Sequence, residues 1–420
     1  MRLAAVRRIG APAIVFALPL AAVAWAWPED LPPWRSLAII SAWAGSGLLV
    51  ASLLLMIREP RLARLLGDLG WMYRWHHRSG AAAYLLLLIH PLALGKNGWA
   101  ESPHIAWETL APWTQPWPVW LGWMSLLLLM LGLATTFAWR LSYRRWRGFH
   151  YLLALGVVLG LAHVYVLLGD PGLGLVAIVL CVLAFAWRLV VSDLGLGDHP
   201  YRVVRVQRCA ARIIEATLAP CATALRVSPG QFVLAAFGDG PRYHGCGEAH
   251  PFTVSGMTRD GSLKIAVKAL GPCTRRLQEL EPDVLLRVQG PFGSFLADGA
   301  GSPQLWVAGG VGITPFIAAL RDRLPTQPTT LIYLYRRVAE AAFLDELRAL
   351  AVADPCFELR GQACGEEPPA LDQLLATVSR LTERQVQVCG PSGLVEALRE
   401  SLRRLGLPAA SIHFESFDFR

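Results

Sequence analysis

The 420-residue sequence predicts a multidomain membrane protein: a six-helix transmembrane bundle, then an antiparallel β-barrel domain and an α/β domain built on a parallel sheet. Three observations predict this order. Long apolar runs are confined to the first half of the chain, although hydrophobic residues make up 54% of the whole. Short β-branched runs separated by Gly and Pro follow them. The last third alternates apolar strands with helical stretches. The predicted parts cover residues 1–197, 198–299 and 300–420.

The membrane part contains six apolar runs. The first follows a basic N-terminus, as the apolar core of a signal peptide does. Trp25, Trp27 and Pro28 stand where a small-residue cleavage site would be needed, so we expect a retained membrane helix. The six runs lie at residues 11–27, 36–57, 79–95, 118–137, 149–168 and 172–191.

The arginines predict the orientation of the bundle. The loops between the second and third runs and between the fourth and fifth are rich in arginine, whereas the alternate loops carry mainly acidic residues. Cytoplasmic loops are the positively charged ones, so both termini are expected in the cytoplasm. This topology explains the net charge of +8, and we expect no nucleic-acid partner. The arginines are Arg58, Arg61, Arg64, Arg74, Arg78, Arg140, Arg144, Arg145 and Arg147.

Histidines at both ends of two apolar runs suggest haem ligands. The third run carries His76 (or His77) and His90, and the fifth carries His150 and His163. A neutral imidazole is costly in hydrocarbon unless its nitrogens are occupied. Fourteen residues separate the first pair, which puts both rings on one helix face about 21 Å apart. We therefore predict two stacked haems, the alternative being hydrogen bonds to neighbouring helices. The thirteen-residue spacing of the second pair turns its rings by about 140°, which requires local distortion or differently angled haems.

The eight cysteines suggest no metal cluster. None forms a CxxC pair, so neither an iron–sulfur cluster nor a zinc site is indicated. All but Cys181 lie in the C-terminal half, which the predicted topology places in the reducing cytoplasm. Disulfides are therefore not expected.

The second half begins after a glycine-rich linker near residues 194–203. Six short β-branched runs then indicate a small barrel or sandwich. Beyond Pro303, the segment QLWVAGGVGITPFIAALRDRL reads as a strand, a glycine turn and a helix, and further strands alternate with helices. That alternation predicts a parallel sheet with crossover helices.

Three motifs in this half carry chemistry. The segment HPFTVS at residues 250–255 is, taken alone, an ordinary strand. The segment GGVGITP at 309–315 lies between a strand and a helix, where glycines let backbone N–H groups approach a pyrophosphate, although it lacks the GxGxxG pattern. The segment CGPS at 389–392 ends a later strand. The last two motifs are expected together at the carboxyl ends of parallel strands, where ligands bind.

Taken in order, these segments resemble the NADPH oxidase and ferric reductase superfamily in its compact prokaryotic form, over nearly the whole chain. The resemblance implies a two-haem membrane domain joined to a ferredoxin–NADP reductase-like module with FAD and NADPH (or NADH), in a bacterial inner (plasma) membrane. It implies two b-type haems, with His76 and His150 as inner ligands and His90 and His163 as outer ligands.

The resemblance also assigns the flavin site. The HPFTVS segment resembles the flavin-binding HPFT motif, KIAVKALGPCT a second flavin segment with Thr274 near the pyrophosphate, and GPFG at 290–293 the GPYG loop. An aromatic residue of the C-terminal tail would stack on the flavin: Phe417, with Phe419 as the alternative. The implied flavin-site residues are His250, Pro251, Phe252, Thr253, Ser255, Lys268, Gly271, Thr274 and Phe417.

The nucleotide site follows from the same resemblance. GGVGITP corresponds to the NAD(P) pyrophosphate loop and CGP to the nicotinamide side, which makes Thr253, Cys389 and Phe417 the expected residues around hydride transfer. Arg336 and Arg337 follow a strand where a ribose 2′-phosphate would lie, and they favour NADPH over NADH. The implied nucleotide-site residues are Gly309, Gly310, Gly312, Thr314, Pro315, Arg336, Cys389, Gly390 and Pro391.

The expected function is electron transfer from cytoplasmic NAD(P)H through FAD and two haems to an extracytoplasmic acceptor. Molecular oxygen giving superoxide is the first choice, because acidic outward loops would repel an anionic ferric chelate. A ferric-chelate reductase, and a haem relay to a periplasmic redox partner, are the alternatives. The expected partners are membrane lipid and the small-molecule acceptor, with no obligatory protein subunit evident.

Overall fold

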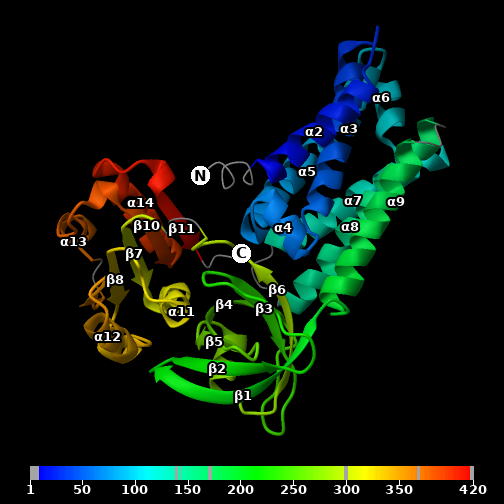
Figure 1. Ribbon diagram of the computed structural model, residues 1–420. Helices are drawn as coiled ribbons and strands as arrows, with labels where there is room; N and C mark the ends of the chain where they lie inside the picture. The colour runs from blue at the N-terminus through cyan, green and yellow to red at the C-terminus, as the bar shows by residue number, and fades with distance from the viewer. Residues whose placement is uncertain are drawn as a thin grey trace. The chain divides into compact units, whose positions relative to one another are not determined.

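The computed structural model describes residues 9–137, 141, 143–168, 173–297, 301–366 and 369–416. Chain contacts divide the protein into two compact units, Arg2–Leu196 and Gly197–Arg420. The first is a bundle of helices, and the second contains all of the described β-strands (Figure 1). We call them the helical unit and the reductase unit.

In the helical unit, all six predicted apolar runs form helices. Five of the described helices are long and apolar enough to cross a membrane, whereas α2 has only 16 residues. Two short helices, α4 and α6, lie between the long ones, and a π-helical turn, η2, continues α9. The elements are α2 (Gly10–Trp25), α3 (Pro33–Leu54), α4 (Pro60–Leu66), α5 (Leu69–Trp99), α6 (Pro103–Leu110), α7 (Trp117–Phe137), α8 (Tyr143–Leu168), α9 (Leu173–Trp187) and η2 (Arg188–Asp193).

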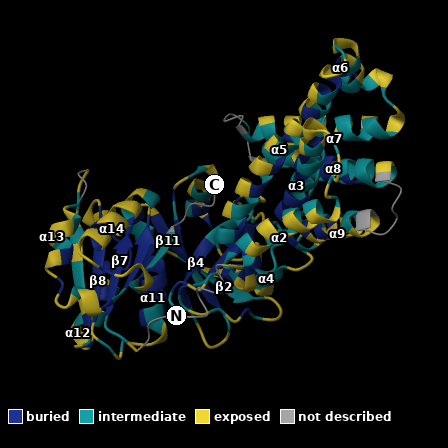
Figure 2. Cartoon of the chain, turned by 90° about the horizontal axis from the view of Figure 1, so that it is seen from above, coloured by how far each residue is buried: buried dark blue, intermediate teal, exposed yellow. Residues whose placement is uncertain are grey.

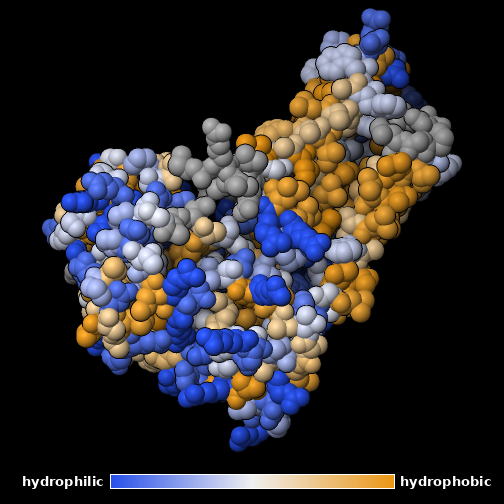
Figure 3. Space-filling view, viewed as in Figure 1, coloured by the Kyte–Doolittle hydropathy of each residue, from blue (hydrophilic) through white to orange (hydrophobic). Residues whose placement is uncertain are grey.

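The helical unit has an apolar exterior. Large apolar side chains such as Phe16, Leu127 and Leu183 are exposed, and Figure 2 shows exposed positions along the outer sides of the helices. The face of the helical unit seen in Figure 3 is hydrophobic over most of its length, and hydrophilic residues gather toward its two ends. Helices that are apolar all round belong in a membrane. Small residues let them approach closely: a Cβ on Gly47 of α3 would lie 2.6 Å from the Cα of Pro19 in α2.

The first part of the reductase unit is a closed antiparallel barrel rather than a sandwich. Its strand order is β1-β2-β5-β4-β3-β6. Apolar side chains that alternate along the strands, including Tyr201, Val254 and Ile265, fill its interior. Its elements are β1 (His199–Ala210), β2 (Ile213–Pro220), β3 (Phe232–Phe237), β4 (His250–Met257), β5 (Leu263–Lys268), α10 (Pro272–Arg276) and β6 (Leu285–Phe292).

The second part of the reductase unit is a parallel five-stranded sheet in the order β11-β10-β7-β8-β9. Helices α11 and α12 contribute to one hydrophobic cluster, and α13 and α14 to another. The chain steps from β7 outward to β8 and returns on the other side at β10, which makes the carboxyl ends of β7 and β10 the switch point where ligands bind in such sheets. The elements are β7 (Gln304–Gly309), η4 (Gly310–Ile313), α11 (Thr314–Asp322), β8 (Thr329–Tyr335), α12 (Leu344–Ala353), β9 (Phe357–Ala363), α13 (Leu371–Ala376), β10 (Gln385–Gly390), α14 (Ser392–Arg404) and β11 (Ile412–Ser416).

The predicted fold class is therefore confirmed: apolar helices, an antiparallel barrel and a parallel-sheet domain follow one another along the chain. The described helices differ from the prediction in two ways: α4 and α6 were not predicted, and α2, which contains Pro19, has only 16 residues. A helix of about 20 residues is needed to cross a bilayer upright, so α2 alone is short for a full span.

Candidate functional site

The two histidines expected at the inner level, His76 and His150, lie on α5 and α8. The rings of His76 and His150 face each other edge to face, with centroids 6.0 Å apart. Nδ1 of His76 lies 2.8 Å from the hydroxyl and 3.0 Å from the carbonyl of Ser52 in α3. Trp146 stacks on His150 with a centroid distance of 4.7 Å. The rings of His76, His150 and Trp146 thus lie next to one another at this level.

The outer histidine level surrounds a cavity. Nδ1 of His90 lies 2.9 Å from the carbonyl of Ala38, and Nδ1 of His163 lies 2.8 Å from the carbonyl of Pro118. Both rings line a cavity of about 320 Å³ among α3, α5, α7 and α8. Gly122 of α7 leaves room for one ring, because a Cβ there would lie 3.1 Å from Nε2 of His163.

The backbone contacts fix how three of these imidazoles are protonated. A carbonyl oxygen can only accept a hydrogen bond, so Nδ1 of His76, His90 and His163 must carry the hydrogen. The lone pair then sits on Nε2, which is the arrangement that metal-bound histidines adopt. Nδ1 of His150 is buried with no partner among the described residues. The three tethered imidazoles would therefore be able to hold a haem iron through Nε2.

His77, the alternative to His76, is placed differently. Its side chain is exposed, and its Nδ1 lies 2.9 Å from the carbonyl of Tyr73 in the same helix. His76, in contrast, is tied to another helix and faces His150. The geometry therefore favours His76.

A buried charge cluster in the helical unit had no signal in the sequence. Asp193 of η2 lies 3.1 Å from the guanidinium of Arg188 and 3.8 Å from that of Arg58. The hydroxyl of Tyr151 in α8 donates to the same carboxylate at 2.7 Å. These contacts join the end of α9 to α8 and to the segment before α4. Buried charges of this kind are stable only when paired.

In the barrel, the HPFTVS motif forms most of β4. Phe252 is buried in the barrel core edge-on to Phe237, and Thr253 is also buried. His250 and Pro251 are partly exposed at the start of the strand. Burial lowers the pKa of His250, and the nearby Glu248 partly opposes this. Only the first residues of the motif are thus open to a ligand.

The second predicted flavin segment ends in a hydrogen-bonded turn. The hydroxyl oxygen of Thr274 accepts the backbone N–H groups of Leu270 and Gly271, each at 2.9 Å. Upstream in β5, Lys268 extends toward the glycine loop: its Nζ would be 3.5 Å from a Cβ on Gly310. Two predicted cofactor segments, one in the barrel and one in the sheet domain, therefore meet.

The surroundings of Lys268 are positively charged. Burial lowers the pKa of Lys268, Glu340 opposes this, and Arg336 and Arg212 lower it further. A lysine in such surroundings would regain its ordinary pKa if an anion bound beside it. The cluster fits the phosphate groups of a nucleotide.

The second and third motifs do lie at one sheet edge. Gly310 has a φ of +55°, a conformation that suits glycine. Gly312 lies so close to the carbonyl of Cys389 that a Cβ would overlap it. Burial raises the pKa of the Cys389 thiol well above its usual value. Thr314 Oγ1 donates to the carbonyl of Val311 at 2.9 Å and helps to close the loop before α11.

Comparison with known proteins agrees with this architecture. The family "Ferric reductase like transmembrane component" matches residues 41–161, which include three of the four histidines. A flavohemoprotein of Pseudomonas putida KT2440 is 28% identical over 236 residues, covering 53% of this chain and 59% of that protein. Ferredoxin–NADP reductase B of Sorangium cellulosum is 31% identical over 166 residues, covering 35% of this chain and 68% of that protein.

The two halves thus match two different kinds of protein, joined in one chain. The chain belongs to the NADPH oxidase and ferric reductase superfamily. Among solved structures, the FAD/NAD-binding domain of a nitric oxide dioxygenase from Vibrio cholerae is similar, at 20% identity and a TM-score of 0.46, covering 52% of this chain and 98% of that domain. The chain spans 59% of the length of the flavohemoprotein.

In the reductase unit, a partly buried arginine joins the barrel to the sheet domain. Arg321 of α11 forms ion pairs with Glu215 of β2 at 2.6 Å and with Glu346 of α12 at 2.7 Å. It also donates to the carbonyl of Ser255 at 3.0 Å, and the Ser255 hydroxyl donates to Glu215 at 2.6 Å. The side chain of Ser255, which the resemblance assigned to the flavin, is therefore engaged with this arginine network.

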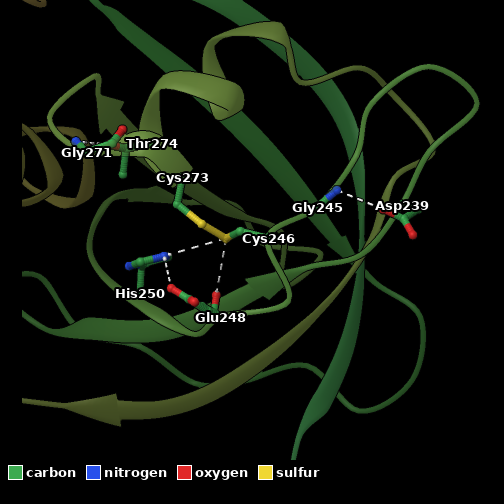
Figure 4. The surroundings of a disulfide bond; sticks show 8 residues. All are labelled: Asp239, Gly245, Cys246, Glu248, His250, Gly271, Cys273 and Thr274. Atoms are coloured by element: carbon green, nitrogen blue, oxygen red, sulfur yellow. Dashed lines mark hydrogen bonds and ion pairs between the residues drawn. A yellow bond between two sulfur atoms is a disulfide. The ribbon is translucent and has the colours of Figure 1, made fainter. Parts of the chain in front are cut away.

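The expectation of no disulfide was wrong. Cys246, in the loop between β3 and β4, is bonded to Cys273 of α10, with their Cα atoms 5.8 Å apart (Figure 4). The reason lies in the barrel topology, which brings segments 27 residues apart into contact. Cysteine spacing along the chain carries no signal of such a contact.

The remaining predicted residues lie in the nucleotide part or outside the described chain. Arg336 follows β8 and lies 3.9 Å from Glu366, and Arg337 lies 3.1 Å from Glu340. Phe417 and Phe419 lie outside the described residues, so the stacking residue stays a prediction.

Proposed function

We propose that this member of the superfamily carries electrons from NAD(P)H through FAD and two b-type haems across a membrane, and that it reduces molecular oxygen to superoxide. The observation that carries the proposal is the tethering of His76, His90 and His163 through Nδ1 to backbone carbonyls on neighbouring helices. When bound, FAD supplies the conversion of hydride transfer into single-electron transfer, and each haem iron supplies a one-electron carrier.

The residues of the reductase unit support binding of both nucleotides. His250 and the Thr274 turn are the accessible parts of the predicted flavin segments. Lys268 and Arg336 supply positive charge beside the glycine loop at Gly310. Backbone N–H groups and cations suit pyrophosphate recognition.

The direction of transfer follows from the proposed orientation. The arginine-rich loops favour an orientation in which the helical unit lies in a bacterial plasma membrane and the reductase unit and both termini lie in the cytoplasm. With the cell interior negative, outward movement of an electron is favoured by about 2.3 kcal/mol per 100 mV. The membrane potential would therefore assist export from the inner histidine level to the outer one.

The described surroundings of the outer histidine level carry no charge that would bind an anionic acceptor. Its polar lining includes Ser46, Thr109 and Gln115, and no lining residue in the described part of the chain is Asp, Glu, Lys or Arg. Nothing in this lining would attract an anionic ferric chelate, whereas dioxygen needs no charged partner. The balanced reaction is NADPH + 2 O₂ → NADP⁺ + 2 O₂•⁻ + H⁺.

The test uses the purified full-length chain in detergent. We expect two haems per polypeptide, oxygen consumption with NADPH, and cytochrome c reduction that superoxide dismutase suppresses. His90→Ala should lose at least one haem and all superoxide formation, whereas the exposed His104→Ala should behave as wild type. Full retention of two haems in His90→Ala would refute the ligand assignment. Anaerobic reduction of ferric citrate at a higher rate, with no effect of dismutase, would identify a ferric reductase instead.

A further inference from the structure

The Cys246–Cys273 bond links two segments that the proposed function assigns to FAD. Cys246 lies four residues before His250, the first residue of β4, and Cys273 directly precedes Thr274. Figure 4 shows the bond between the start of β4 on one side and the Thr274 turn on the other. We propose that this cysteine pair is a reversible redox site whose disulfide strengthens FAD binding and whose reduction weakens it. The proposal rests on the proposed function.

The position of the bond explains why its state would matter. The chain from Gly245 to Ala249 forms no helix or strand, and the crosslink restrains it together with the hydrogen bond from the Gly245 N–H group to Asp239. On the other side, Thr274 shapes the turn at Gly271 that is predicted to receive the pyrophosphate. Joining the two segments removes freedom that flavin binding would otherwise have to remove, and preorganisation of this kind raises affinity.

The pair is accessible to redox reagents and has a base beside it. Both cysteines are only partly buried. Nε2 of His250 lies 3.6 Å from Sγ of Cys246 and 3.9 Å from the carboxylate of Glu248. From this position the neutral ring of His250 can accept a proton from the Cys246 thiol, although burial lowers the pKa of His250 and so weakens it as a base. A thiolate is the reactive form in thiol–disulfide chemistry.

The proposed location also favours a reversible bond. The reductase unit is assigned to the cytoplasm, where thiols are kept reduced and disulfides, when present, are mostly redox-sensing or catalytic. The other described cysteines are all free, including the exposed Cys221. The pairing is therefore selective for one site.

Each step balances with two cellular reagents. A hydroperoxide oxidises one thiol to a sulfenic acid and leaves as water or an alcohol; the second thiol then attacks that sulfur and releases water. In reverse, a small cellular dithiol attacks the bond, supplies two electrons and two protons, and becomes a disulfide itself. Formation of the bond thus consumes one peroxide, and reduction consumes one dithiol.

A metal site is the competing interpretation. The ligand atoms of Cys246, His250 and Cys273 all lie within 4.8 Å of one another, and two thiolates with an imidazole are donors that zinc accepts. The structure favours the redox site, because the two sulfur atoms are bonded to each other.

The experiment uses the full-length protein in lipid nanodiscs, treated either with hydrogen peroxide or with dithiothreitol. Peptide mapping after maleimide labelling reports the state of each cysteine, and flavin fluorescence reports the Kd for FAD. We expect the oxidised wild type to bind FAD about tenfold more tightly than the reduced form. Cys246→Ser and Cys273→Ser should keep the weaker affinity after both treatments. The matched control, Cys221→Ser, should respond as wild type does.

Three results would overturn the inference. The first is equal FAD affinity in the two wild-type states, with the bond shown by mapping to form and break; this would leave the proposed function intact. The second result is that one equivalent of added zinc binds the reduced protein and protects both thiols from maleimide, which would identify a metal site. The third is a wild type that binds no FAD in either state, which would refute the proposed function and this inference with it.

Discussion

The histidine levels of the helical unit and the arginine network of the reductase unit hold their buried polar groups in opposite ways. In the helical unit, three imidazoles each bond to one backbone carbonyl, and none of the three forms an ion pair in the described part of the chain. In the reductase unit, Arg321 and Glu215 belong to a network that spans two domains. Lipid penalises charge, so neutral imidazoles with backbone acceptors suit the histidine levels, and charges are buried where they pair, as at Asp193 in the helical unit and at Arg321 in the reductase unit. A substitution at a histidine level should therefore affect only that level, whereas a substitution in the arginine network should affect both domains of the reductase unit.

The first prediction, which has the largest expected effect, tests whether a substitution in the helical unit leaves the reductase unit unaffected. Gly122→Leu places a side chain against the ring of His163, where even a Cβ would be 3.1 Å from Nε2. We expect loss of the outer haem and of all acceptor reduction, with NADPH–ferricyanide activity of the flavin module unchanged. Haem counting by pyridine haemochrome and the two activity assays measure this.

A matched control exists in α8. A Cβ on Gly148 would meet no atom within 4 Å, so Gly148→Leu should retain both haems. If Gly122→Leu kept two haems, the outer cavity would not be a haem site. If Gly122→Leu abolished ferricyanide reduction by the flavin module, its effect would not be confined to the helical unit, and the contrast between the two units would fail.

The second prediction concerns the network. Arg321→Met would leave Glu215, whose side chain is 1% exposed, without its cation. Breaking a buried pair from one side costs about 3 kcal/mol, so we expect denaturant unfolding of the reductase unit at a clearly lower midpoint. The double variant Glu215→Gln/Arg321→Met should recover part of this loss. Arg337→Met removes an exposed ion pair and should change stability by less than about 1 kcal/mol. Equal effects of the two arginine variants would contradict the prediction.

The sequence predicted what depends on repeated or spaced residues. Apolar runs gave the helices, and the alternation of strands and helices gave the parallel sheet. The segments GGVGITP and CGPS were expected at one sheet edge, and Gly312 and Cys389 do meet there. Their cofactor roles, like those of the four histidines, stay predictions.

What the sequence could not reveal depends on contacts between distant segments. The Cys246–Cys273 bond joins residues that no spacing rule pairs. Ser255 appeared only as part of a flavin motif, and its hydroxyl turns out to bond to Glu215 on another strand. The acceptors for the histidines are backbone carbonyls, such as that of Ala38, which any residue could supply. Because every residue has a backbone carbonyl, the residue types in the sequence do not reveal these acceptors.

The third prediction sharpens the contrast within the reductase unit, because Arg336 is exposed and lies only 3.9 Å from one partner, Glu366. Removing it should affect recognition alone. We expect Arg336→Ala to raise the KM for NADPH about tenfold and to leave the KM for NADH unchanged, since a hydrogen bond to a charged group contributes about 1.5 kcal/mol. Arg348→Ala, which removes an exposed arginine paired with Asp345 on α12, is the control. Equal efficiency with both cofactors in wild type, unchanged in Arg336→Ala, would refute the preference.

The smallest expected effect is a pH dependence at the start of β4. Burial lowers the pKa of His250 in the folded protein, whereas the unfolded chain titrates near 6.5. Below that pH the unfolded chain binds a proton that the folded protein does not, so the free energy of unfolding falls as the pH drops from about 6.5 toward the folded pKa. His250→Gln should flatten this slope in urea unfolding between pH 7 and pH 5, and the exposed His244→Gln should not. An unchanged slope in His250→Gln would mean that other groups cause the acid sensitivity. Since Glu248 opposes the shift, Glu248→Gln should steepen the slope, which a purely structural role of His250 would not predict.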